Sequence, residues 1–299
     1  MSEPKLAVVI ASCVGAPFIT RCLASLETQR DAEGVEFIVV DRAGGETAKH
    51  IASQFSWARL ISAEAPISVP DLRRRGIDAA SAEYVAIIEE HCTAAPDWIA
   101  TILKSLAAEP AAALGGPVHD NGYRKLMDWA VYFTEYNSYL PPYEAGALTN
   151  ICAANCVYRR DLMVEHLPAE GSGYWEAVVN WKLAEAGHAM RSEPSMIVRH
   201  TGPFGFGYYL GQRYLFSRAF AGVSRSTKPK WYPLLYLICS PLLVVLLWLR
   251  TAQRVFGKQH RKGKFLLATP ILIPVCCTYV IGELMGYLRG PGDALDRIE

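Results

Sequence analysis

The chain has 299 residues, more than one minimal domain needs, and a nearly balanced net charge of +1. The charge is unevenly distributed: residues 1–193 hold 16 Lys and Arg against 25 Asp and Glu, whereas residues 194–282 hold 12 Lys and Arg and no acidic residue. The basic part also contains two uncharged apolar runs, 231–249 and 265–282. Such long, uniform runs exclude a groove-reading nucleic-acid element and favour attachment to an anionic membrane surface.

The N-terminus does not have the pattern of a signal peptide. An acidic residue stands near the start, and the apolar run that follows is short and β-branched. We therefore expect the N-terminal part in the cytoplasm. The eight cysteines are scattered, and none forms the paired CxxC clusters of a zinc site, so they are interpreted as reduced, small hydrophobic residues.

Apolar β-branched runs alternate with segments of helical periodicity from residue 6 onward. The predicted strands are 6–11, 35–40, 58–61 and 84–88, and the predicted helices are 18–29, 47–55, 69–80, one that begins near 96–98 and one that begins near 177. This βαβα order predicts an α/β domain with a mainly parallel sheet and helices on both faces.

The predicted strand 84–88 is a continuous apolar run, which suits a central strand buried on both faces. It stops abruptly at Glu89, Glu90 and His91. In open α/β sheets ligands bind outside the carboxyl ends of the strands. Two carboxylates and an imidazole therefore stand where a metal and a phosphorylated ligand would be held. The alternative is a solvated polar strand end followed by a helix.

Five stretches in this order resemble glycosyltransferase family 2, whose members have the nucleotide-sugar-binding GT-A fold. They are VVIASCVGAPFITRCLASLETQ, FIVVDRAGG, LRRRGIDAASAEYVAIIEEH, ICAANCVYRRDLM and GYWEAVVNWKLAEAGHAMR. The resemblance implies a Rossmann-like GT-A glycosyltransferase domain over residues 1–225. Residues 226–299 are then expected to form membrane-associated helices with a basic connecting loop.

The resemblance also implies residues that bind the donor, a nucleotide-diphosphate sugar. Asp41 ends the second strand, where the family has a pair of Asp residues of which one helps to hold the base; here Arg42 replaces the second. Arg73 and Arg74 lie on the helix before the strand 84–88. Either one of them reaches the nucleotide, or both belong to a solvated basic face.

Glu89-Glu90-His91 replaces the Asp-x-Asp metal motif of the family. By resemblance, Glu89 and His91 hold a divalent metal, Mn²⁺ or Mg²⁺, against the diphosphate, and Glu90 binds the ribose or is structural. An imidazole suits Mn²⁺ or another transition metal better than Mg²⁺. A structural His91 and a degenerate, inactive site remain as alternatives. His200 is either an additional metal ligand or a surface histidine.

Glu176 aligns with the carboxylate that serves as catalytic base in the family, where it is usually an Asp. A Glu near a helix start is also a favourable charge–dipole placement, which is the structural alternative. The function predicted from these residues is a membrane-attached inverting glycosyltransferase that acts on a lipid-linked or surface-glycan acceptor. The alternative is a non-catalytic nucleotide-sugar-binding or assembly subunit on the same fold.

The two apolar runs are near the length of a membrane span, but prolines are expected to interrupt both of them. The loop Arg250–Lys264 is strongly basic, and basic residues also precede the first run. If the first run crossed the membrane, the loop would face outward, against the positive-inside rule. We therefore expect a re-entrant or interfacial first segment at the cytoplasmic face of the inner membrane, with ordinary two-pass insertion as the alternative. Membrane lipids and a homo-oligomer or glycan-synthesis complex are the expected partners.

Overall fold

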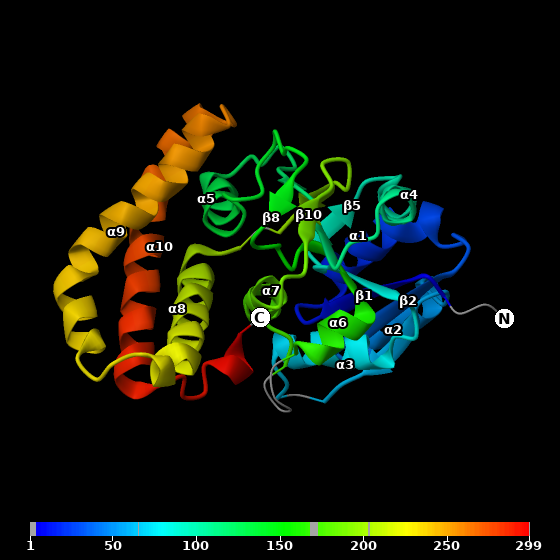
Figure 1. Ribbon diagram of the computed structural model, residues 1–299, viewed down its shortest axis with the longest axis horizontal. Coiled ribbons are helices and arrows are strands. Elements are labelled where there is room, and N and C mark those ends of the chain that lie inside the picture. The colour runs from blue at the N-terminus through cyan, green and yellow to red at the C-terminus, as the bar shows by residue number, and fades with distance from the viewer. Residues whose placement is uncertain (1–3, 65, 168–172, 203, 299) are drawn as a thin grey trace. The chain divides into compact units, whose positions relative to one another are not determined.

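The computed structural model describes residues 4–64, 66–167, 173–202 and 204–298 (Figure 1). The chain forms two compact units. Unit 1 comprises Met1–Asn121 and Pro141–Gly202, and unit 2 comprises Gly122–Leu140 and Pro203–Glu299. The division between the units thus differs from the boundary predicted at residue 225. Two segments that precede residue 225 belong to the same unit as the C-terminal helices.

An eight-stranded mixed sheet forms the centre of unit 1, in the order β3-β2-β1-β4-β9-β6-β10-β8. Its strands are β1 (Leu6–Ser12), β2 (Val35–Asp41), β3 (Arg59–Ser62), β4 (Tyr84–Ile88), β6 (Ala113–Gly115), β8 (Ala147–Leu148), β9 (Asn155–Arg159) and β10 (Met190–Ser192). The four N-terminal strands β3, β2, β1 and β4 pair in parallel, as predicted. Strand β9 is antiparallel to both of its neighbours, so the complete sheet is mixed.

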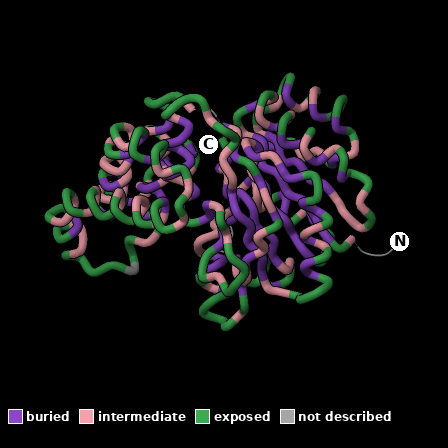
Figure 2. The backbone as a smooth tube through the Cα atoms, turned by 90° about the horizontal axis from the view of Figure 1, so that it is seen from above, coloured by how far each residue is buried: buried purple, intermediate pink, exposed green. Residues whose placement is uncertain are grey.

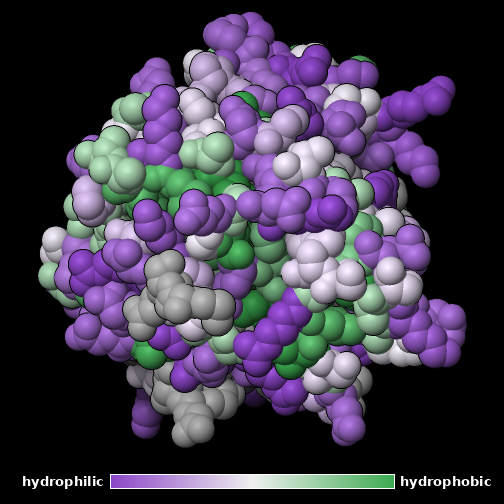
Figure 3. Space-filling view, turned by 90° about the vertical axis from the view of Figure 1, so that its right-hand side faces the viewer, coloured by the Kyte–Doolittle hydropathy of each residue, from purple (hydrophilic) through white to green (hydrophobic). Residues whose placement is uncertain are grey.

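Strands β1 and β4 are buried along their whole length, which explains why they are continuous apolar runs in the sequence. Figure 2 shows the buried residues following the strands. The helices of unit 1 are α1 (Ala16–Leu26), α2 (Gly45–Gln54), α3 (Val69–Ala79), α4 (Trp98–Ala108), α6 (Arg160–Glu165) and α7 (Glu176–Glu185). Figure 3 shows that the face turned to the viewer is mainly hydrophilic, with hydrophobic atoms in the hollows between polar side chains.

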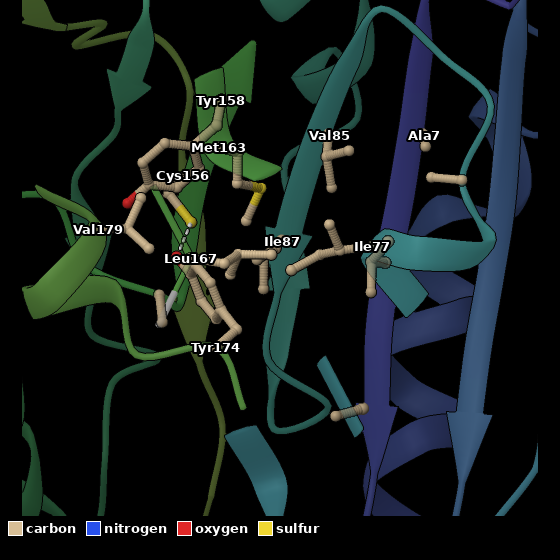
Figure 4. Close-up of a cluster of buried hydrophobic side chains, with 14 of the residues drawn as sticks. Ala7, Ile77, Val85, Ile87, Cys156, Tyr158, Met163, Leu167, Tyr174 and Val179 are labelled. Carbon is tan, nitrogen blue, oxygen red and sulfur yellow. Dashed lines mark hydrogen bonds between the residues drawn. The ribbon is translucent and has the colours of Figure 1, made fainter. Parts of the chain in front are cut away.

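One hydrophobic cluster lies against the sheet and includes residues of α3, α6 and α7 (Figure 4). Ile77 of α3, Met163 of α6 and Val179 of α7 belong to it, together with Val85 and Ile87 of β4. Successive side chains of a strand point to opposite faces, so the intervening residues of β4, which are also buried, face the other side. The strand is therefore covered on both faces.

A second sheet of three short strands joins distant parts of unit 1. It contains β5 (Cys92–Ala94), β7 (Val118–His119) and β11 (Val198–His200), in the order β5-β11-β7. The antiparallel pairing of β11 with β5 places His200 opposite Cys92. This register brings His200 to the segment that follows β4.

Unit 2 contains the helices α5 (Leu126–Glu135), α8 (Phe206–Ser224), α9 (Tyr232–Gly257) and α10 (Lys262–Arg289). Helices α8 and α10 approach each other closely at Gly282 and Gly286. A Cβ atom at Gly282 would lie 2.0 Å from Ser217 Oγ, and one at Gly286 would lie 2.4 Å from the carbonyl oxygen of Arg218. Glycine at these two positions is therefore needed for the packing of the two backbones.

The expected interruption by prolines is wrong, because each apolar run belongs to one continuous helix. Pro233 lies in the first turn of α9, where its missing N–H is not needed, and Pro241, Pro270 and Pro274 lie inside helices. An internal proline removes a hydrogen bond and favours a bend, but the helix continues on both sides of it. The helices have 26 and 28 residues, about 39 and 42 Å at 1.5 Å per residue, enough to cross a hydrocarbon layer of about 30 Å.

Helix α9 leaves one apolar face exposed. Only 6% of its most apolar window is buried, against 33% for α10. Leu234, Ile238, Leu242 and Val245 are each at least half exposed and follow each other at helical spacing. A core helix of a water-soluble unit does not expose an apolar stripe of this kind.

Candidate active site

Four charged or titratable side chains meet where β4 ends. Glu89 Oε1 accepts a hydrogen bond from Arg73 Nη2 at 2.9 Å, and Glu89 Oε2 lies 3.2 Å from His91 Nε2. Arg73 Nη1 lies 3.8 Å from Glu176 Oε2. The single guanidinium of Arg73 therefore joins the carboxylate at the strand end to the carboxylate predicted to be the base.

The Arg73 side chain is only 12% exposed, and those of Glu89 and Glu176 are 18% and 26% exposed. Burial lowers the pKa of Arg73, but the negative charges of Glu89 and Glu176 raise it more, so the net pKa lies above its usual range. The cation is thus permanent at any pH at which the protein is folded.

Glu176 is the first residue of α7, and two contacts of the preceding loop bring it to Arg73. Tyr174 N donates a hydrogen bond to the carbonyl oxygen of Pro70, in the first turn of α3. Gly173 has a φ of 65°, and a Cβ there would lie 2.5 Å from Pro70 Cβ and 2.8 Å from Asp71 N. Only glycine permits this contact, which fixes the start of α7 beside the helix that carries Arg73.

Gly173→Ala is expected to lower the free energy of unfolding by roughly 1–3 kcal/mol, because it combines a disfavoured φ with overpacking. Gly187→Ala is the matched control: Gly187 also has a positive φ, but no atom would lie within 4 Å of its new Cβ. Denaturant titration measures both. Equal losses in the two variants would show that the contact with Pro70 contributes nothing.

His200 is completely buried, so the interpretation as a surface histidine is wrong. Its ring centroid lies 5.4 Å from that of His91, with the ring planes at 86°. Burial lowers the pKa of His200 to about 3, assisted by His91 and opposed by Glu89. At neutral pH His200 is therefore an uncharged imidazole, the form that ligates metals.

His91 is held by its backbone as well as by Glu89. Its carbonyl oxygen accepts hydrogen bonds from Thr201 N at 2.7 Å and Thr201 Oγ1 at 2.8 Å. Burial lowers the pKa of the His91 imidazole, but the hydrogen bond and charge of Glu89 and the charge of Glu90 raise it more, so the net pKa lies above its usual value.

Glu89, His91 and His200 have the donor chemistry of a site for Mn²⁺ or another transition metal, with one carboxylate and two imidazoles. In the part of the chain that the structure describes, however, no three His, Cys, Asp or Glu side chains are arranged to hold a metal as they stand. The Glu89–His91 contact at 3.2 Å occupies the carboxylate oxygen that a metal would take. Glu89, His91 and His200 are therefore of the residue types that bind a divalent cation. A bound cation would replace the contact between Glu89 and His91.

Glu90 points away from this group, toward the end of β1. Its Oε1 accepts hydrogen bonds from Cys13 N at 2.9 Å and Val14 N at 3.0 Å. Its Oε2 is buried and has no hydrogen-bond partner among the described residues. Burial raises the pKa of Glu90 above its usual range, although His91 and the two N–H groups lower it. The second oxygen is thus a buried acceptor beside the loop that follows β1.

Asp41 and Arg74 have local partners. The Asp41 carboxylate is 1% exposed and accepts hydrogen bonds from Ser12 Oγ at 2.6 Å and Gly44 N at 2.8 Å, which hold the turn after β2. Arg74 Nε donates to both carboxylate oxygens of Asp78 at 2.9 Å on an exposed part of α3. Of the two predicted arginines, the structure brings only Arg73 to the Glu89–Glu176 group.

Two buried amides that the sequence analysis did not single out support the site. Asn180 of α7 accepts from Tyr158 Oη at 2.7 Å and donates to the Ile151 carbonyl oxygen, so it fixes α7 to β9. Asn155 donates to the carbonyl oxygens of Pro117 and Met196, which lie just before β7 and β11. The sequence feature that could have pointed to Asn155 is a polar residue inside an apolar run, NCVY at 155–158.

Comparison with known proteins identifies the family. The family model described as "Glycosyl transferase family 2" matches residues 7–167, more than half of the chain. The chain belongs to glycosyl transferase family 2. The match includes Glu89–His91 and Arg73 and ends before Glu176. No curated protein matches the sequence.

Solved structures agree with this family 2 chain in fold. The mannosyltransferase PcManGT from Pyrobaculum calidifontis, in complex with GDP-Man and Mn²⁺, has a TM-score of 0.58 and 16% identity, over 96% of this chain and 88% of that one. GalNAc-T7 with UDP, GalNAc and Mn²⁺ has a TM-score of 0.51 and 15% identity, over 67% of this chain and 43% of that one. The mixed α/β GT-A fold predicted from the sequence is confirmed.

Proposed function

We propose that this family 2 protein is a membrane-attached, inverting glycosyltransferase that transfers a sugar from a nucleotide-diphosphate donor to a lipid-linked or surface-glycan acceptor. The observation that carries the proposal is the Arg73 bridge between Glu89, at the end of β4, and Glu176, at the start of α7. It places a carboxylate suited to proton abstraction beside the strand end at which α/β proteins bind ligands.

In this mechanism Glu176 accepts the proton of the acceptor hydroxyl. The acceptor oxygen forms a bond to the anomeric carbon from the face opposite the leaving group, the bond from that carbon to the diphosphate breaks, and the nucleoside diphosphate leaves with the electron pair. Arg73 positions the base, since its other nitrogen is fixed by Glu89. Asp41, through the β2 turn, and Glu90 Oε2 border the nucleoside part of the donor.

Glu89, His91 and His200 would hold a divalent cation, which would supply positive charge to the leaving diphosphate. Two similar structures contain Mn²⁺ together with a nucleotide or nucleotide sugar, which supports this assignment. The burial of His200 beside His91 supports it independently.

His91→Ala is expected to abolish the stabilisation that a nucleoside diphosphate and Mn²⁺ together give to the protein. At a ligand concentration of about 100 Kd that stabilisation is about 2.7 kcal/mol. Thermal unfolding with Mn²⁺, with EDTA and with each nucleotide alone measures the loss. His188→Ala, just after the turn that follows α7, is the control. Undiminished stabilisation of His91→Ala would remove His91 from the metal site.

The deciding experiment is turnover across a panel of nucleotide sugars, with and without Mn²⁺, as transfer or as slow donor hydrolysis. The non-catalytic alternative, a nucleotide-sugar-binding or assembly subunit, is favoured by the Arg73 and His91 contacts that already occupy Glu89. It predicts binding of a nucleotide sugar with no turnover of any panel member. Turnover that is lost in Glu176→Gln supports the enzyme.

Membrane attachment is proposed from unit 2 alone. Helix α9 has an exposed apolar face, and basic residues stand before it and after it. Burial of apolar side chains contributes about 1.5–3 kcal/mol each, and each Lys or Arg near an anionic surface adds about 1 kcal/mol. We place both ends of α9 at the cytoplasmic face of the inner membrane, with the helix in the interface.

This topology predicts the labelling of two engineered cysteines. In Ser226→Cys and Gln259→Cys, which flank α9, both thiols are expected to be protected from a membrane-impermeant reagent in intact cells and to react after permeabilisation. Each of the two variants serves as the control for the other. Labelling of only one of them in intact cells would show that α9 crosses the bilayer.

A further inference from the structure

Unit 2 contains a partly open cavity of about 190 Å³ among the helices α5, α8, α9 and α10. Its lining residues come from α5 and the turn after it, α8, α9 and α10: Thr134, Asn137, Arg213, Leu247, Trp248, Thr251, Leu272, Val275, Cys276 and Tyr279. About 10–15 Å³ of such volume admits one water molecule, so the cavity has room for a small polar headgroup. The lining is part polar and part apolar, and none of it belongs to the site in unit 1.

Arg213 is the charged residue of this lining, and it is held rigidly. Its Nη1 lies 2.9 Å from Glu135 Oε2, and its side chain is 14% exposed. The guanidinium also stacks over the rings of Phe216 and Tyr209 at 4.7 and 5.6 Å. Its Nε is buried and has no acceptor within the described part of the chain. The charge is therefore balanced by Glu135, while one strong donor lacks an acceptor.

The hydroxyl groups of the lining offer acceptors. Thr134 Oγ1 donates its hydrogen to the carbonyl oxygen of Ala130 at 2.8 Å, and Thr251 Oγ1 donates to that of Leu247 at 3.1 Å. Each hydroxyl oxygen therefore has lone pairs left but no hydrogen. A group that fills the cavity well accepts one hydrogen bond from Arg213 and donates one to a threonine.

Asn137 and Tyr279 are the other polar residues of the lining, and the remainder is mainly apolar. Leu247 and Trp248 come from α9, and Leu272 and Val275 come from α10, the two helices that are long and apolar enough for a membrane. Helix α9 exposes its outer face, so a hydrocarbon chain that leaves the cavity finds apolar surface beside it.

We propose that this cavity binds the uncharged, hydroxyl-bearing headgroup of a membrane lipid, with the lipid's chain along α9 and α10. A hydroxyl both accepts from Arg213 Nε and donates to a threonine oxygen, whereas a phosphate brings a second anion next to Glu135 and has no hydrogen for the threonines. The inference rests on membrane attachment of unit 2 and is independent of sugar transfer in unit 1.

The test uses the full chain purified in detergent and supplied with diacylglycerol or with phosphatidylglycerol of the same acyl chains. Native mass spectrometry is expected to show at least tenfold more retained diacylglycerol than phosphatidylglycerol. Cys276→Phe fills the cavity and is expected to reduce this retention at least tenfold, while Cys277→Phe, the adjacent residue outside the lining, leaves it unchanged. Arg213→Lys keeps the charge, loses the Nε donor and is expected to weaken retention without unfolding the protein.

Preferential retention of phosphatidylglycerol, or equal retention by Cys276→Phe and Cys277→Phe, would overturn the proposal. Stabilisation by a nucleoside diphosphate is measured on the same samples. Lipid retention without nucleotide binding contradicts only the proposed sugar transfer, and nucleotide binding without lipid retention contradicts only the cavity assignment.

Discussion

Glu176→Gln is expected to reduce turnover by roughly 10²–10⁴, the range for loss of a general base. The amide has the same shape and still reaches Arg73, so the start of α7 is preserved, but it does not accept the acceptor proton. Donor affinity, measured by thermal stabilisation with a nucleoside diphosphate, is expected to change little. The change therefore separates proton abstraction from donor binding.

Glu185→Gln is the matched control for this experiment, because Glu185 ends the same helix and is exposed. Turnover of this control is expected to equal that of the unmodified chain. Normal turnover of Glu176→Gln would show that Glu176 only stabilises the start of α7 and that the base is another residue.

Arg73→Leu is expected to lower the free energy of unfolding by about 3 kcal/mol, because loss of one partner leaves buried carboxylates without their cation. This estimate is at the low end for a buried pair, since Glu89 and Glu176 keep 18% and 26% exposure. In a folding unit of the size of unit 1 the loss corresponds to a fall of roughly 6–12 °C in Tm. Turnover is expected to fall as well, since neither carboxylate is then held in place.

Arg74→Leu controls for the loss of an arginine from the same helix. Its ion pair with Asp78 is exposed, so the expected loss is about 0.5 kcal/mol or less. Arg73→Lys restores the charge without the two-pronged geometry and is expected to recover stability better than turnover. If Arg73→Leu is no less stable than Arg74→Leu, the bridge has no structural role.

Strands β1, β2 and β4 of unit 1 were predictable because burial on both faces leaves a continuous apolar run, as in 84–88. The end of that run places Glu89 and His91 at the ligand-binding edge. The Arg73–Glu176 contact was not predictable from spacing. It depends on Gly173, which lets the loop before α7 approach Pro70. Sequence resemblance supplied both residues, but not the fact that they meet.

The burial of His200 could not be predicted from the sequence either, because the residue lies in a short strand. Strand β11 has three residues, Val198–His200, too few for a period to be recognised, and its pairing with β5 decides that the imidazole is buried. Likewise, the run 231–249 indicated a membrane segment but not a continuous helix through Pro241, because neighbouring helices and not local propensity determine whether a proline ends a helix.

Unit 2 is assembled from two separate pieces of chain, and this has a consequence for biosynthesis. Helix α5 leaves the ribosome well before α8, α9 and α10 exist, although its Phe133 packs against Phe265 of α10 and its Glu135 pairs with Arg213 of α8. During translation the aromatic side chains of α5 therefore remain unpacked until α8 and α10 have been synthesised. A nascent chain that stalls after α8 would present an incomplete helical bundle in which Phe133 of α5 lacks its partner Phe265 of α10.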